Sequence, residues 1–98
     1  MTDDLVQFVE ARLTEAVDRA RWTGNALITQ APTLGVPIEA AERQARLQLH
    51  AAEMMLALFQ DTIRPYLGTA GPMGRIAEQQ LRLVAAMHAG HDDYREEG

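Results

Sequence analysis

The segment between Pro37 and Pro65 restricts the possible folds more than any other part of the chain. Pro37 suits the first position of a helix, because proline lacks the amide hydrogen that would be left unpaired there. Pro65 disfavours helical geometry in the residue before it, so one long helix is expected over residues 37–64.

This long helix carries apolar residues on two sides. One stripe at helical spacing consists of Ile38, Ala41, Ala45, Leu49, Ala52, Leu56, Phe59 and Ile63. A second stripe, on nearly the opposite side, consists of Leu47, Ala51, Met54 and Leu58. A helix that is apolar on two sides packs on two sides, which predicts a neighbouring helix against each stripe.

Two shorter helices are expected, over residues 3–21 and 72–89. In the first, seven apolar residues fall within one arc about 120° wide: Leu5, Val6, Val9, Leu13, Ala16, Val17 and Ala20. In the second, the predicted buried face consists of Met73, Ile76, Ala77, Leu81, Leu83, Val84 and Met87. Gln80 falls inside that face, so its amide is expected either to hydrogen-bond a neighbouring loop carbonyl or to mark a contact surface.

Residues 22–36 break the helical pattern, since they contain two glycines, a proline and an asparagine, which favour turns. We predict a connection here, with Trp22, Leu27 and Ile28 folded back onto the core. The chain is then one all-α domain over residues 1–98, a small antiparallel three-helix bundle with a long central helix. A short acidic tail follows at residues 90–98.

The composition excludes several kinds of chemistry. The 98 residues include no cysteine and no serine, which removes disulfides, thiolate metal sites and the commonest catalytic nucleophiles. No apolar run approaches the roughly 20 residues that span a bilayer, and the acidic start MTDD is unlike a secretory signal. We therefore expect a cytoplasmic protein that is not an enzyme and needs no cofactor.

The charged residues argue against direct binding to nucleic acid. The net charge is −5, and four glutamates stand four residues before an arginine, in the order that favours ion pairs on a helix. These pairs are Glu15–Arg19, Glu39–Arg43, Glu42–Arg46 and Glu78–Arg82. A nucleic-acid site needs unpartnered basic residues gathered on one face, and this pattern differs from that.

Histidines and acids at helical spacing suggest two metal sites, but neither has the required ligand set. His50 and Glu53 are three residues apart, yet both fall in the polar sector of the long helix. His88 and His91 are separated by Gly90, which breaks the helix. A metal site needs several ligands directed at one point, so none is expected.

Residues 4–15 read DLVQFVEARLTE, residues 81–86 read LRLVAA and residues 91–97 read HDDYREE. These segments resemble a family of small actinobacterial and actinophage proteins classed as a domain of unknown function. That family begins D-L-V-x-F-[LV]-x-A-R-L-x-E and ends with an L-R-x-L-A helix followed by H-P-D-Y-x-x-E-W. Asp92 stands where the family has proline, and Gly98 where tryptophan is common. The resemblance implies a phage or actinobacterial origin and brings no established activity with it.

These features predict a non-enzymatic accessory or regulatory protein, phage-encoded or phage-derived, that acts by binding another protein. The alternative is an acidic DNA mimic that inhibits a host nucleic-acid-binding protein. Neither involves a membrane. The candidate tail contacts are His91, Tyr94 and Arg95, and we expect the Tyr94 ring to dock on the bundle.

Helix lengths predict where a partner binds. The long helix spans about 42 Å at 1.5 Å per residue, whereas the first helix spans only about 27 Å. Part of the long helix therefore stays uncovered in a monomer, unless residues 22–36 cap it. The candidate partner or dimer surface consists of Leu47, Met54, Met55, Leu58 and Phe59. Two-fold pairing through this surface is the simplest closed arrangement, which predicts a homodimer.

Overall fold

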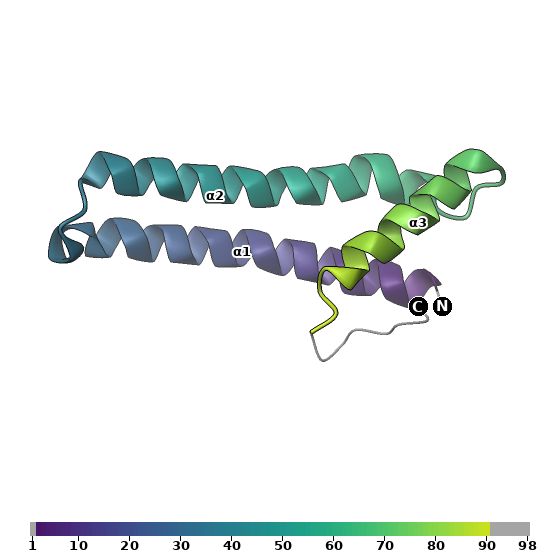
Figure 1. Ribbon diagram of the computed structural model, residues 1–98, viewed down its shortest axis with the longest axis horizontal. Coiled ribbons are helices and arrows are strands. Elements are labelled where there is room, and N and C mark those ends of the chain that lie inside the picture. The colour runs from purple at the N-terminus through teal and green to yellow at the C-terminus, as the bar shows by residue number, and fades with distance from the viewer. Residues whose placement is uncertain (1, 91–98) are drawn as a thin grey trace.

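The computed structural model describes residues 2–90, and this part of the chain is all-α (Figure 1). The helices are α1, Thr2–Leu34; α2, Ile38–Leu58; and α3, Pro72–Ala86. Between α2 and α3 lie a π-helical turn, η1, at Phe59–Ile63 and a 3₁₀ turn, η2, at Arg64–Tyr66. The expectation of three helices is confirmed.

The arrangement is a long helical hairpin with a third helix across one end. Figure 1 shows α1 and α2 side by side in opposite directions, joined by a short turn, with α3 at the end away from that turn. The molecule measures 54 × 26 × 14 Å, and its radius of gyration is 16.7 Å. A compact domain of this length has a radius of gyration of about 13 Å. The second helix is therefore one arm of a hairpin, whereas we had expected it at the centre of a bundle.

α1 continues through the predicted loop, so the prediction of a connection over residues 22–36 is wrong. Six of its buried and half-buried residues follow one another at intervals of four and three: Leu13, Val17, Ala20, Gly24, Leu27 and Ala31. This spacing keeps one face of a helix against its partner over many turns. Packing of that face outweighs the weak helix propensity of Gly24 and Asn25. Only residues 35–37 connect the helices, and Gly35 has a φ of 73°, a conformation that favours glycine.

Trp22 was expected to fold back onto the core, and this prediction is also wrong. The residue projects from the middle of α1 and is 74% exposed. Leu27 and Ile28 are half-buried. Leu27 and Ile28 follow Trp22 by five and six residues, so in a helix they point in other directions than Trp22 does. Trp22 therefore lies on the side of α1 away from α2.

Small residues bring the two arms of the hairpin together. A Cβ atom added at Gly24 would lie 2.9 Å from the Cβ of Ala45, closer than such atoms come in real contacts. Ala31 and Ala41 are almost completely buried near the turn. The first stripe of α2 faces α1, and among its members only Ile38, beside the turn, is exposed. The prediction of a second helix against the other stripe is wrong, because α3 lies across the end of the hairpin and leaves Leu47, Met54 and Leu58 exposed.

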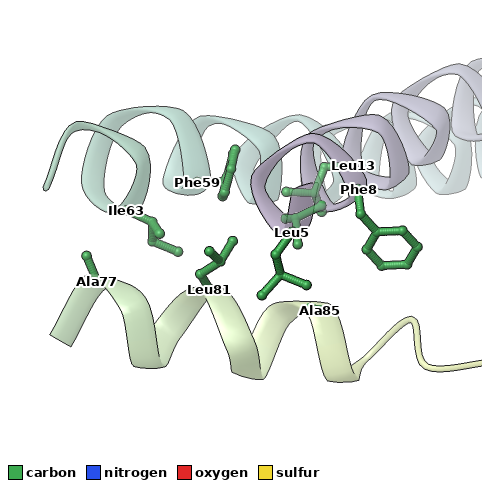
Figure 2. Packing of buried hydrophobic residues seen from close by; sticks show 9 residues of the cluster. Leu5, Phe8, Leu13, Phe59, Ile63, Ala77, Leu81 and Ala85 are labelled. Atoms are coloured by element: carbon green, nitrogen blue, oxygen red, sulfur yellow. The ribbon is translucent and has the colours of Figure 1, made fainter. Parts of the chain in front are cut away.

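The largest buried cluster lies at the end where three helices meet. We call it the core cluster: Leu5, Phe8, Val9 and Leu13 of α1, Phe59 and Ile63 of η1, and Ala77, Leu81 and Ala85 of α3. Figure 2 shows the α3 side chains directed at those of η1 and α1. The third helix therefore packs on the start of α1 and on η1.

The end of α2 widens into a π turn just before Pro65. In a continuing α-helix the proline ring would clash with the carbonyl group four residues earlier, which favours a change of backbone geometry here. Within the turn, Phe59 and Ile63 both enter the core cluster. The hydroxyl of Thr62 donates a hydrogen bond of 2.6 Å to the Leu58 carbonyl. The predicted end of the helix near residue 64 agrees with this change.

Ion pairs connect the elements at the surface. Arg64 Nη1 lies 2.7 Å from Glu10 Oε2 and links η2 to α1, and Arg21 lies 3.7 Å from Glu53 between the arms. Of the four pairs predicted along single helices, Glu15–Arg19 and Glu78–Arg82 are formed, each at 3.1 Å. Within residues 2–90, the pairs Glu39–Arg43 and Glu42–Arg46 are not formed. Exposed pairs of this kind are each worth about 1 kcal/mol or less.

Candidate functional site

The first candidate surface is the side of α2 that faces away from α1. We call Leu47, Ala51, Met54 and Leu58 the outer α2 stripe. Its three large side chains are 48–60% exposed, and Ala51 is exposed as well. The first stripe of α2, which we call the inner stripe, packs against α1, and the two stripes project from nearly opposite sides of the helix. The hairpin therefore directs the outer α2 stripe to solvent.

Three of the five residues predicted as a partner surface belong to this stripe, and two do not. Leu47, Met54 and Leu58 are exposed, whereas Met55 is half-buried against the core cluster. Phe59 is 1% exposed and lies inside that cluster, so its assignment to the partner surface is corrected. The reason is geometric: Phe59 is on the inner stripe, and the π turn keeps it directed at α1 and α3.

Basic side chains flank the outer α2 stripe on one side. A shallow, open hollow beside Leu47 is lined by Arg43, Arg46, Leu49, His50 and Glu53. Neither Arg43 nor Arg46 forms an ion pair with another residue between 2 and 90. An apolar ridge with two available guanidinium groups at its edge suits a partner whose apolar surface has acidic residues beside it.

A second apolar surface lies on α3. We call Met73, Ile76, Gln80, Leu83 and Met87 the outer α3 stripe. Its four apolar side chains are 50–70% exposed, whereas Gly74, Ala77, Leu81 and Ala85 face the core. The predicted buried face of this helix joined members of both groups, and it is wrong for the exposed four. With Gln80 included, the exposed residues are spaced 3-4-3-4 along the helix, and this spacing was the signal that distinguishes the two groups.

Gln80 is exposed at the centre of the outer α3 stripe. The expectation of a buried amide that bonds a loop carbonyl is therefore corrected. Of the two alternatives considered from the sequence, the position agrees with a residue on a contact surface.

The outer side of α1 is acidic, but arginines compensate many of its carboxylates. Glu10 pairs with Arg64 at 2.7 Å, and Glu15 pairs with Arg19 at 3.1 Å. Asp18 lies 3.9 Å from Arg21. A surface that imitates a phosphate backbone needs carboxylates without such internal counterions.

The described residues do not bring metal-binding side chains together. No group of three or more histidine, aspartate or glutamate residues between positions 2 and 90 could hold an ion. His50 is exposed beside the outer α2 stripe. The ring of His88 meets the ring of Phe8 edge-on, with centroids 6.5 Å apart.

The tail contacts predicted at His91, Tyr94 and Arg95 lie outside the described residues, as does the expected docking of the Tyr94 ring.

Comparison of the chain with protein-family models, with curated proteins and with solved structures found no match. Among the described helices, none combines the length and the apolar character that crossing a bilayer requires.

Proposed function

We propose that this chain is a non-enzymatic accessory or regulatory protein, of phage origin, that acts by binding another protein through the outer α2 stripe. The observation that carries the proposal is the exposure of Leu47, Met54 and Leu58 along one line of an extended arm. The three-helix end would act as the folded base of a small bundle, and the hairpin would present the binding surface.

The energetics favour an occupied stripe. Burying a Leu or Met side chain completely gains about 1.5–3 kcal/mol, so completing the burial of three half-exposed ones offers roughly 3 kcal/mol to a partner. The residue types also suit a contact surface, because methionine adapts its shape to irregular apolar partners. Arg43 and Arg46 would add orientation by pairing with acids on the partner.

The experiment is affinity capture from a lysate with three forms of the chain. Met54→Glu places a charge on the outer α2 stripe, and Thr29→Glu places the same charge on exposed α1. A partner of this surface is captured by the unsubstituted chain and by Thr29→Glu, and is lost with Met54→Glu. If every captured protein is retained equally by all three forms, the proposal is wrong.

Salt concentration separates this proposal from the DNA-mimic alternative. A contact that depends mainly on apolar burial weakens little as salt rises, whereas a mimic depends on charges that a Debye length of about 8 Å screens at physiological ionic strength. Loss of the captured protein between low and moderate salt, with no effect of Met54→Glu, would favour the mimic.

A further inference from the structure

We propose that the outer α3 stripe is a self-association surface, which pairs α3 of one copy with α3 of a second copy in antiparallel orientation. Helix lengths predicted a homodimer through α2, and the sequence placed Met73, Ile76, Leu83 and Met87 on a buried face of α3. The structure exposes all four. This inference is independent of the partner proposed for the outer α2 stripe.

The residue order in the stripe is symmetric about its centre. Met73 and Met87 stand seven residues before and after Gln80, and Ile76 and Leu83 stand four before and three after it. A two-fold axis beside Gln80 would place each Met73 near Met87 of the second copy. The same axis would place each Ile76 near Leu83 of that copy. Such an interface uses the same surface on both copies and closes as a dimer.

The central amide suits a second copy of the same surface. A glutamine side chain carries both donors and an acceptor, so two Gln80 amides meeting at the axis can satisfy each other. The charged residues of α3, Arg75, Glu78 and Arg82, lie on the third side of the helix, away from both the core and the stripe. The stripe therefore brings no like charges together. A single polar residue in such a seam also fixes register.

The available area indicates a reversible dimer. A Leu, Ile or Met side chain offers roughly 100 Å² of apolar surface when fully exposed, so the four side chains offer on the order of 200 Å² per copy. Standard interfaces bury about 800 Å² per partner. The contact is therefore smaller than a standard interface, so pairing should be weak and should depend on protein concentration.

Light scattering on the full chain tests the proposal. The measured mass should rise from 10.9 kDa toward twice that value between micromolar and millimolar concentration. Leu83→Glu, which places two charges in the pairing surface, should remain at 10.9 kDa throughout. Gln79→Glu, one residue from the stripe and on the polar side, should behave like the unsubstituted chain. A mass that stays constant for the unsubstituted chain, or a dimer that survives Leu83→Glu, would overturn the proposal.

Cross-linking then tests the position of the axis. The chain contains no cysteine, so a single substitution introduces a unique thiol. A disulfide requires Cα atoms about 4.4–6.8 Å apart, which the axis provides for two residues at position 80. Gln80→Cys should form covalent dimers several-fold faster than Gln79→Cys under the same oxidant. Equal rates for the two variants would contradict the two-fold arrangement.

Discussion

Gly24 of α1 lies against Ala45 of α2, so closely that a Cβ atom added at Gly24 would come within 2.9 Å of the Ala45 Cβ. The glycine stands in the middle of a helix, where it costs about 1 kcal/mol relative to alanine. Gly24 therefore allows the two arms to approach closely, and it does not form a turn.

Exchanging the two residues tests this contact. Gly24→Ala should fail to stabilise the chain despite its better helix propensity, because the arms must move apart. Ala45→Gly should cost about 1 kcal/mol. The double variant should regain the free energy of unfolding of the unsubstituted chain, with a coupling of at least about 1 kcal/mol. Urea unfolding of the four forms measures it, and a higher stability of Gly24→Ala alone would contradict the close contact.

Gly74 at the start of α3 should be still less tolerant of a side chain. A Cβ atom there would overlap the carbonyl oxygen of Thr69, in the turn that leads into the helix. Because backbone rather than a flexible side chain must move, Gly74→Ala should destabilise the chain by about 1–3 kcal/mol. Gly90→Ala is the control, since no heavy atom lies near a Cβ at that position. Similar melting temperatures for the two variants would show that the turn is packed differently.

Leu81 and Leu83 report how α3 is rotated. Leu81 is completely buried in the core cluster, whereas Leu83 belongs to the outer α3 stripe. Leu81→Ala should therefore cost about 2–5 kcal/mol, the range for buried leucines. Leu83→Ala should cost about 0.5 kcal/mol or less when measured at low concentration, where the chain is monomeric. Equal losses of unfolding free energy would mean that both residues share one buried face.

The fluorescence of Trp22 tests whether residues 22–34 are helical and directed outward. The side chain is 74% exposed, so its emission should stay close to that of tryptophan in water and shift little on unfolding. At the same time, amide hydrogens of residues 24–31 should exchange slowly, because they are bonded within α1. A blue-shifted emission together with fast exchange would contradict the helix and support the predicted loop, with Trp22 folded onto the core.

The bounds of α2 and α3 could be predicted because proline and glycine act locally. Pro37, Pro65 and Pro72 restrict the backbone wherever they occur, and the structure changes geometry close to each of them. The same reasoning failed for residues 22–34, because Gly24, Asn25 and Pro32 also resemble turn residues when taken singly. The spacing of small residues against a second helix decided the outcome there, and that is a tertiary effect.

The candidate surfaces could be predicted only in part for a related reason. Periodicity separates the two stripes of α2, but it does not say which stripe of α3 meets the core. Its buried members are mostly small, including Ala77 and Ala85, while the large ones, Met73 and Met87, are exposed. Large apolar residues are ordinarily the better guide to a core. Here α3 meets α1 and η1 through a face whose members are mostly small.

Small-angle X-ray scattering of the Leu83→Glu variant tests the central claim, that the chain is an extended hairpin presenting the outer α2 stripe. At a concentration where its mass is 10.9 kDa, the radius of gyration should be near 16.7 Å, with a longest dimension near 54 Å. A radius of about 13 Å, the value for a compact domain of this length, would contradict the hairpin and the exposed surface that depends on it.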